Sequence, residues 1–250
     1  MANNIKNIAK LILPKSIQWY LRKISLSMRI KKQDNSFSNK SAKKIFSTIY
    51  SERLWGEVDG ERFCSGHGSH LQSHISPYVK SLQSLLGKFD PPLNVVDLGC
   101  GDFNVGSKIR AMSKKYIACD VVPELIERNE VKFSDLGVDF RVLDITKDPL
   151  PQGDLVIIRQ VFQHLSNKEI MMVVPKLYQY KYLILTEYIP GSLFTPNIDQ
   201  PTGAYSRLSR GITSGIVLTE GPFNLRIKSE RTICETPEHE GTLRVILYEF

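Results

Sequence analysis

A glycine turn that follows an apolar run constrains this chain more than any other feature of its sequence. Residues 95–98 read Val-Val-Asp-Leu, residues 99–101 read Gly-Cys-Gly, and the next glycine is Gly106. Glycine permits a positive φ and lets a ligand touch the backbone, and a helix that begins after such a turn offers free N–H groups. A dinucleotide-binding turn would carry its third glycine where this chain has Asn104, and Asp102 would repel a diphosphate at close range. The turn therefore predicts a ligand site, and its spacing disfavours a pyrophosphate.

Short apolar runs rich in β-branched residues recur after residue 90, with helical patterns between most of them. They lie at residues 93–98, 116–119, 138–143, 155–158 and 182–185. This alternation predicts a parallel sheet that helices cover on both faces. Residues 225–234 and 243–250 flank a Pro-Glu-His-Glu-Gly turn at 237–241, which predicts an antiparallel hairpin at the C-terminus.

Two acidic residues follow the second and third of these runs. Asp120 comes 19 residues after Gly101, the separation at which a carboxylate can accept from both hydroxyls of a ribose. Asp144 ends the next run, where it could accept the amino group of an adenine. Aspartate is also frequent at strand ends as a helix cap, so each residue alone has a structural interpretation. Together with the glycine turn, the regular spacing predicts a ligand that contains a nucleoside.

The N-terminal segment carries the charge of the chain. Its first 34 residues hold eight Lys and Arg and one acidic residue, which accounts for the whole net charge of +7. Apolar residues recur at helical spacing from Ser16 to Ile30, which predicts a short basic amphipathic helix, and the polar residues 31–40 predict a linker. The helix could dock on its own domain or a second subunit, lie on an anionic membrane, or bind nucleic acid. We expect a basic tail and linker over residues 1–40 and one domain over residues 41–250.

The cysteines and the hydropathy disfavour several other classes of protein. The four cysteines lie far apart without a Cys-x-x-Cys pair, which argues against a zinc site or a disulfide framework and favours a reducing cytoplasm. No run approaches the roughly 18 apolar residues of a membrane span. Lys6 and Lys10 interrupt the N-terminal apolar stretch, so we do not expect a signal peptide. The expected location is the cytoplasm, with peripheral contact to the inner membrane surface if the tail binds lipid.

The motifs described so far resemble those of the class I S-adenosylmethionine-dependent methyltransferases. The shared features are the strand that ends in Asp-Leu-Gly-Cys-Gly at 97–101 and the acidic residues Asp120 and Asp144. The resemblance covers about residues 46–250 and implies an α/β, Rossmann-like, seven-stranded, mostly parallel sheet with a C-terminal antiparallel hairpin. It also implies S-adenosyl-L-methionine as the cofactor. Its methionine part would face Asp97 and the turn, its ribose Asp120, and its adenine Asp144 and Ile145.

Three further stretches are similar to small bacterial methyltransferases that are often associated with surface-glycan genes. They are Ile49-Tyr50 with Trp55-Gly56, Ser-Gly-His-Gly-Ser at 65–69, and residues 159–167. By this resemblance the loop at 65–69 would close over the cofactor carboxylate; alternatively, it is an ordinary loop before a helix. The predicted cofactor-binding residues are Trp55, Ser65, Gly66, Asp97, Gly99, Cys100, Gly101, Asp120, Val121, Asp144, Ile145 and Arg159.

Two residues are candidate bases. His164 follows the fourth predicted strand and could take a proton from a hydroxyl acceptor, or it could be a packed helix histidine. Glu187 ends the fifth strand and is either a second base, an acceptor for a substrate hydroxyl, or a structural residue. Gln160 and Gln163 stand where ubiquinone-type O-methyltransferases carry the carboxylates of a metal site, so we expect no metal.

The connection at residues 190–211 is the predicted acceptor site, because loops longer than about 12 to 15 residues are usually functional or disordered. We predict that the acceptor contacts Asn197, Asp199, Tyr205 and Arg207. The expected reaction is methyl transfer to a hydroxyl of a sugar or another small polar acceptor. RNA or protein methylation, or an inactive cofactor-binding scaffold, are the alternatives. The chain lacks the Asn- or Asp-Pro-Pro-Tyr motif of nucleobase amino-methyltransferases, which disfavours nucleic acid.

Overall fold

The computed structural model describes residues 14–58, 60–238 and 241–250. The chain divides into two compact units, Met1–Asn39 and Lys40–Phe250, which we call the N-terminal unit and the sheet unit. Within the described residues, no helix combines the length and the apolar character that crossing a bilayer requires.

The N-terminal unit contains one long helix, α2 (Lys15–Phe37). The prediction of a helix near residues 16–30 is confirmed, but the prediction of a linker from residue 31 is wrong because α2 continues through residue 37. Lys31, Lys32 and Gln33 have good helix propensity, and no glycine or proline interrupts residues 15–37, so a polar and aperiodic sequence does not end the helix. Residues 1–13, which include Lys6 and Lys10, lie outside the described residues.

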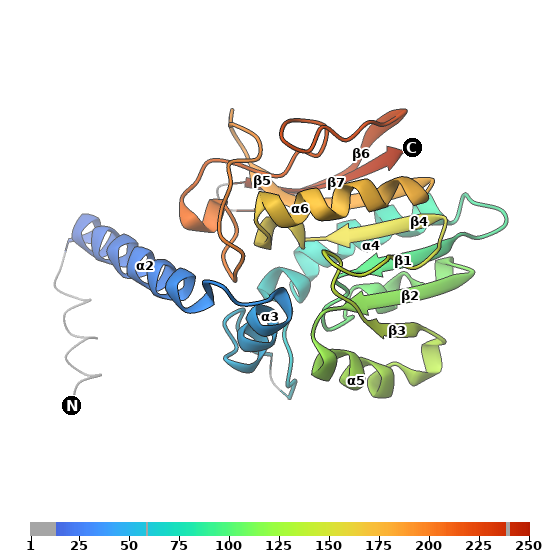
Figure 1. Ribbon diagram of the computed structural model, residues 1–250, viewed down its shortest axis with the longest axis horizontal. Helices are drawn as coiled ribbons and strands as arrows, with labels where there is room; N and C mark the ends of the chain where they lie inside the picture. Colours follow the sequence, from blue (N-terminus) through green and yellow to red (C-terminus); the bar gives the residue numbers. More distant parts are fainter. Residues whose placement is uncertain (1–13, 59, 239–240) are drawn as a thin grey trace. The chain divides into compact units, whose positions relative to one another are not determined.

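The sheet unit is built on seven strands in the order β3-β2-β1-β4-β5-β7-β6, which Figure 1 shows running from β3 to β6. Neighbouring strands from β3 to β5 are parallel, whereas β7 is antiparallel to both β5 and β6. The predicted fold class is confirmed. The strands are β1 (Asn94–Leu98), β2 (Lys115–Asp120), β3 (Asp139–Val142), β4 (Leu155–Arg159), β5 (Tyr182–Pro190), β6 (Ser229–Glu238) and β7 (Gly241–Glu249).

Separate cores cover the two faces of the sheet because successive strand residues point to opposite sides. Val96 and Val156 pack with residues of α6 (Asn167–Val173) on one face. On the other face, Val95 packs with residues of α4 (Gln72–Leu86) and α5 (Pro123–Lys132). The expectation that both faces are covered is confirmed.

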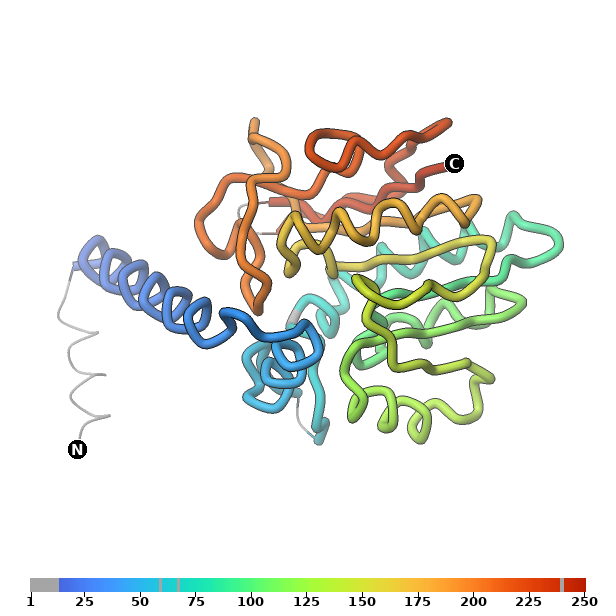
Figure 2. The backbone as a smooth tube through the Cα atoms, viewed as in Figure 1, coloured from blue at the N-terminus to red at the C-terminus, as the bar shows by residue number. Residues whose placement is uncertain are grey.

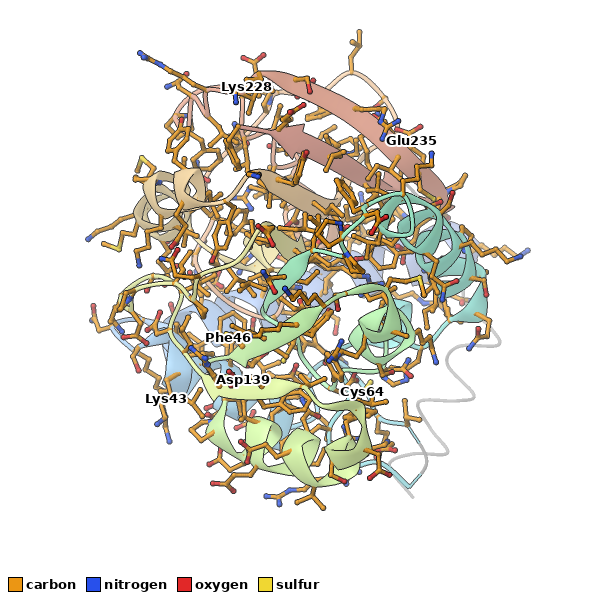
Figure 3. All side chains as sticks on the ribbon, turned by 90° about the vertical axis from the view of Figure 1, so that its right-hand side faces the viewer. Lys43, Phe46, Cys64, Asp139, Lys228 and Glu235 are labelled. Atoms are coloured by element: carbon orange, nitrogen blue, oxygen red, sulfur yellow. The ribbon has the colours of Figure 1, made fainter. Side chains whose placement is uncertain are left out.

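Helix α3 (Ala42–Ser51) belongs to the sheet unit and directs its apolar residues toward the interior of that unit. Ser41 begins the helix by accepting a hydrogen bond from the backbone N–H of Lys44. Ile45 and Ile49 are buried, and Phe46 is half-buried, whereas Lys43 on the opposite face of the helix is exposed. Figure 3 shows Phe46 directed inward and Lys43 directed outward.

The C-terminal hairpin differs in its bounds from the prediction. Strand β6 continues through Pro237 and Glu238, and Glu238 pairs with Gly241, so the strands extend into the predicted turn at 237–241. Proline is tolerated here because β6 is an edge strand. The first hairpin strand begins at Ser229, not at Leu225, whose N–H instead donates to the carbonyl of Leu218. The hairpin therefore carries Glu238 further toward the carboxyl ends of the parallel strands than the sequence indicates.

A long irregular connection joins β5 to β6, drawn in orange in Figure 2. Its single regular element is a short 3-10 helix at Leu208–Arg210. The connection begins at the same edge of the sheet at which the glycine turn follows β1, because β5 is parallel to β4 and β4 to β1.

Candidate functional site

A cavity of about 960 Å³ lies at the carboxyl ends of β1, β2, β4 and β5. Its walls come from α3, the loop at 65–69, the glycine turn, the segments after β3 and β4, and the β5–β6 connection. The structure brings all the predicted cofactor-binding residues to this one cavity, together with His164: Trp55, Ser65, Gly66, Asp97, Gly99, Cys100, Gly101, Asp120, Val121, Asp144, Ile145 and Arg159. Their binding roles stay predictions.

The glycine turn forms one wall of the cavity with its backbone. Gly99 and Gly101 have φ values of +79° and +57°. A Cβ atom at Gly99 would lie 2.4 Å from a methyl group of Val161, and one at Gly101 would lie 2.3 Å from Ser65 Oγ. Conformation and space therefore both require glycine at these positions.

Asp120 ties this turn to the end of β2. Its two carboxylate oxygens accept hydrogen bonds from the N–H groups of Gly101 and Val122, each at 3.1 Å. Asn129 on α5 donates to the carbonyl of Gly101 at 2.7 Å. Asp120 is 8% exposed, and burial raises its pKa to about 6. Each oxygen keeps a lone pair that can accept from a ligand hydroxyl.

Asp97 and Arg159 lie at the ends of β1 and β4, which are neighbouring strands. Burial raises the pKa of Asp97 to about 7, although the hydroxyl of Tyr116 donates to its carboxylate at 2.9 Å. The guanidinium of Arg159 lies over the ring of Tyr78 and donates to Ser69 Oγ at 3.0 Å. Its buried Nε has no hydrogen-bond partner among the described residues. The two side chains offer opposite charges to a ligand.

Asp102 holds the loop at 65–69 against the glycine turn. Its carboxylate accepts from the N–H of Ser65 and contacts His70 Nε2, both at 2.8 Å. Ser65 Oγ in turn accepts from the N–H of Asp102 at 2.7 Å and lies 2.9 Å from the hydroxyl of Tyr50. Burial opposes ionisation of Asp102, but these hydrogen bonds outweigh it and lower the pKa. Asp102 therefore has a structural role that the sequence did not indicate.

Asp144 is engaged in the turn after β3. Its carboxylate accepts from the hydroxyl of Thr146 at 2.6 Å and from Lys147 Nζ at 2.8 Å. Burial raises its pKa, but these partners outweigh that effect and the pKa is lowered. Ile145 is buried beside it. The contact of these two residues with an adenine stays a prediction.

Aromatic rings form another wall of the cavity. The ring of Trp55 lies 4.9 Å from that of His164, 5.3 Å from that of Tyr50 and 6.0 Å from that of Phe46, measured between ring centres. Trp55 Nε1 donates to the carbonyl of Ala204 at 2.9 Å. The ring is therefore fixed between α3, the segment after β4 and the β5–β6 connection.

His164 is the one candidate base that lines the cavity. Burial lowers its pKa to about 4, so the imidazole is neutral at neutral pH. Its Nε2 lies 3.2 Å from the side-chain amide of Gln163, and its buried Nδ1 has no hydrogen-bond partner within the described residues. This side chain is therefore a weak base with one ring nitrogen uncommitted.

Of the three roles predicted for Glu187, its contacts favour the structural one. Glu187 is 3% exposed and does not line the cavity. Its two oxygens accept from the N–H groups of Phe162 and Gln163, each at 3.0 Å. Burial raises its pKa to about 8 despite these bonds. Glu187 anchors the short 3-10 helix that carries His164, because the unpaired N–H groups of that turn need an acceptor.

The predicted acceptor-binding residues also have other roles, and none of the four lines the cavity. The side chain of Asn197 bonds the backbone of Val217, and Asp199 accepts from the N–H of Asn167 at 2.7 Å. Arg207 is 2% exposed and donates to the carbonyl of Ile198 and to Asn167, each at 2.7 Å. Tyr205 is half-buried.

The contact of these four residues with an acceptor stays a prediction, and three of them have partners within the protein. An irregular segment cannot satisfy its buried backbone groups with a ladder or a helix, so side chains supply the partners. The residues of the connection that do line the cavity are Ser206, Leu208 and Ser209.

Several lining residues were missed by the sequence analysis. Tyr50 and Gln160 stand in motifs that were quoted without a role, and Gln160 has a positive φ of 55°. Tyr188 follows Glu187 at the end of β5, and Glu238 ends β6. Strand alternation would have placed Tyr188 on the face opposite to Glu187. The local sequence around Glu238 carries no such signal.

The comparisons with known proteins agree with this architecture. Residues 95–180 match the profile of a family described as "Methyltransferase domain". No curated protein matches the sequence at a significant level. Among solved structures, the N-methyltransferase NodS from Bradyrhizobium japonicum, in complex with S-adenosyl-L-homocysteine, is similar with a TM-score of 0.56 at 13% identity. The alignment covers 81% of this chain and 98% of that chain.

Two other similar structures contain S-adenosylmethionine. Magnesium protoporphyrin IX methyltransferase from Synechocystis has a TM-score of 0.50 at 18% identity, over 86% of this chain and 94% of that chain. Human N-acetylserotonin methyltransferase has a TM-score of 0.51 at 15% identity, over 84% of this chain and 59% of that chain. At these identities the likeness concerns the fold. Residues 95–180 are therefore similar in sequence to a methyltransferase domain, and the sheet unit shares its fold with these methyltransferases.

Replacing Gly101 by alanine should abolish cofactor binding. The new Cβ would collide with Ser65 Oγ at a φ of +57°, so the turn or the loop above it must shift. Gly211→Ala is the matched control, because Gly211 also has a positive φ, of +78°, but a Cβ there meets no atom within 4 Å. Calorimetry with S-adenosylhomocysteine should show loss of binding in the first variant alone. Equal affinities in both variants would contradict the proposed role of the turn.

Cofactor affinity should rise with pH between about 5 and 7.5. Burial raises the pKa values of Asp97 and Asp120 to about 7 and about 6, from an ordinary value of 3.8. The ligand-free protein therefore binds protons that the unfolded chain releases, and its stability falls as pH rises through this window. A cationic ligand favours the ionised carboxylates, so its affinity changes in the opposite direction. Calorimetric titration across this range measures the effect, and a pH-independent affinity would contradict it.

Proposed function

We propose that this protein transfers the methyl group of S-adenosylmethionine to a hydroxyl of a sugar or another small polar acceptor. The observation that carries the proposal is the single cavity that extends from the glycine turn to His164, Ser206 and Ser209. Its volume of about 960 Å³ lies near the upper end of the usual range for small-molecule sites. One cavity therefore has room for a cofactor and a small acceptor side by side.

The residues at the glycine turn suit S-adenosylmethionine. Gly99 and Gly101 leave space that a Cβ would fill, and Asp120 keeps lone pairs for the ribose hydroxyls. Asp97 offers an acceptor to the amino group, and Arg159 has a buried Nε without a partner among the described residues, which can face the carboxylate. When bound, the cofactor supplies a methyl group on a positively charged sulfur.

The protein contributes mainly orientation, together with a neutral imidazole. Trp55 and Glu187 hold His164 in place, the first through its ring and the second through the backbone of the turn. A hydroxyl becomes acidic as its oxygen forms a bond to carbon, so a base with a low pKa can take the proton at that stage. The imidazole of His164 is the group to which we assign this step.

The choice of a small acceptor is supported by the volume of the cavity and by the proteins that share the fold. The similar structures include enzymes whose names specify N-acetylserotonin and magnesium protoporphyrin IX as substrates. The choice of a sugar rests on the resemblance of residues 49–56, 65–69 and 159–167 to methyltransferases associated with surface-glycan genes. An RNA substrate is less favoured, because the net charge of +7 lies in the first 34 residues and the remainder of the chain has none to attract phosphates.

Calorimetry and a methyl-transfer assay test this function. The protein should bind S-adenosylmethionine and S-adenosylhomocysteine but not NAD, and Asp120→Ala should weaken binding by roughly 1 to 3 kcal/mol because it leaves buried N–H groups unpaired. Transfer of labelled methyl groups to a panel of sugars should occur. His164→Ala should lower kcat far more than it changes KM. Cofactor binding without transfer to any sugar, RNA or protein fraction would instead favour an inactive scaffold.

We further propose that the N-terminal unit makes peripheral contact with an anionic membrane surface. Apolar side chains recur along one face of α2, and all of them are exposed: Ile17, Tyr20, Leu21, Ile24 and Met28. Lys15, Arg22 and Arg29 follow one another at seven-residue spacing and therefore share another face. An apolar face beside a row of cations is typical of helices that lie in a membrane interface.

Liposome sedimentation tests the membrane proposal. The full chain should sediment with vesicles that contain anionic lipid, and high salt should reduce the bound fraction because it screens the attraction. Replacement of Leu21 and Met28 by glutamine should also reduce it, whereas cofactor affinity should not change. Equal sedimentation of the variant and the unchanged protein would contradict the assignment of this face.

A further inference from the structure

Glu238 occupies a place in the cavity that the function proposed above does not use. It is the last residue of β6 and lines the cavity, with its side chain 25% exposed. Its backbone carbonyl accepts a hydrogen bond from the hydroxyl of Tyr188 at 2.8 Å, and Tyr188 lines the same cavity. This contact joins the ends of β5 and β6 and fixes the backbone from which the Glu238 carboxylate extends.

The carboxylate of Glu238 differs from the other carboxylates in the cavity. Asp97, Asp102, Asp120 and Asp144 all accept hydrogen bonds from the protein, as described above. Within the described part of the chain, no hydrogen bond reaches the carboxylate of Glu238, and His74 Nδ1 lies 3.9 Å from it. Its full acceptor capacity is therefore left for a ligand.

His74 lies beside Glu238 behind the cavity wall, and Gln160 lines the cavity. His74 is 8% exposed, and its buried Nδ1 has no hydrogen-bond partner among the residues described. A Cβ atom on Gly68 would lie 3.7 Å from His74 Nδ1 and 3.9 Å from Gln160 Oε1. A methyl group at residue 68 would therefore contact both polar atoms. A buried polar atom that lacks a partner favours a ligand with hydrogen-bonding groups.

The charge of the cavity restricts that ligand further. Five carboxylates line the cavity, and Arg159 is the single Lys or Arg among the described lining residues. His164 adds no charge, because burial keeps its imidazole neutral at neutral pH. An anionic acceptor would be repelled at this short range. A cationic acceptor would have to share the cavity with a positively charged cofactor, so an uncharged acceptor fits best.

We propose that Glu238, backed by His74 and Gln160, binds and orients an uncharged acceptor through two or more adjacent hydroxyl groups. The two oxygens of a carboxylate can accept from two neighbouring hydroxyls at once, as Asp residues do with the hydroxyls of a ribose. This inference rests on the proposed function, because it assigns the acceptor end of the same cavity. It narrows the acceptor to a neutral polyol, of which sugars are the common class.

Binding of three matched sugars to the protein saturated with S-adenosylhomocysteine tests the assignment. The probes are glucose, glucosamine and glucuronate, which share one ring and differ in charge, together with galactose, mannose and rhamnose as further neutral sugars. Saturation-transfer NMR should detect at least one neutral sugar, with weaker signals from glucosamine and glucuronate. Glu238→Gln and Gly68→Ala should each weaken binding of that sugar about tenfold or more. In the transfer assay, Glu238→Gln should raise KM more than it lowers kcat.

Two controls separate this inference from folding and from the proposed function. A Cβ on Gly68 meets its neighbours at ordinary contact distances, so Gly68→Ala should fold normally. Glu235→Gln changes the same residue type on the same strand, but Glu235 pairs with Arg244, does not line the cavity and lies on the hairpin seen at the upper edge of Figure 3. Glu238→Gln and Glu235→Gln should both keep the affinity of the unchanged protein for S-adenosylhomocysteine.

The outcomes that would overturn the inference are distinct from failure of the proposed function. Absence of a signal from every neutral sugar, stronger binding of glucosamine or glucuronate, or equal binding by Glu238→Gln and Glu235→Gln would each overturn it while cofactor binding stays intact. Loss of S-adenosylhomocysteine binding in the unchanged protein would instead overturn the proposed function.

Discussion

The pairing of Asp120 with the N–H of Gly101 is the contact on which the site depends. It joins the end of β2 to the turn after β1, and the carbonyl of the same glycine is held by Asn129. Asp102 then ties the loop at 65–69 to this turn, and Ser65 extends the network to Tyr50 on α3. One short backbone segment thus fixes the positions of elements that are far apart in sequence. The glycines permit it because any side chain there would occupy the space that these contacts need.

The cavity concentrates buried negative charge that the protein does not neutralise by itself. Burial raises the pKa values of Asp97 and Asp120, since removal from water penalises the ionised form. A cationic ligand stabilises the ionised carboxylates and so offsets the cost of burying them. The same buried charge should therefore raise the affinity for a positively charged cofactor. The acidic character also extends to Glu238, which we propose as the acceptor end of the cavity. Carboxylates therefore line the cavity both at the glycine turn and at Glu238.

The polar residues after β5 show where reasoning from sequence is limited. Asn197, Asp199 and Arg207 have the composition of a ligand-binding loop, yet their side chains bond backbone groups of the connection and of the first residue of α6. Glu187 likewise supports the turn that carries His164. The residue type alone does not indicate whether a polar side chain bonds a ligand or a buried N–H group of the protein. Which of the two it meets depends on the path of a segment without regular structure.

The sequence by itself determined the fold class, the position of the glycine turn, and most of the residues that line the cavity near this turn. Those features are local: alternation of apolar residues, a strand that enters a glycine turn, and acids at the ends of strands that parallel pairing brings to one edge. Tertiary structure alone decided the length of α2, the burial of His164 and the arrival of Glu238 at the cavity. These depend on contacts between residues far apart in sequence, and burial and charge at such contacts are properties of the assembled fold.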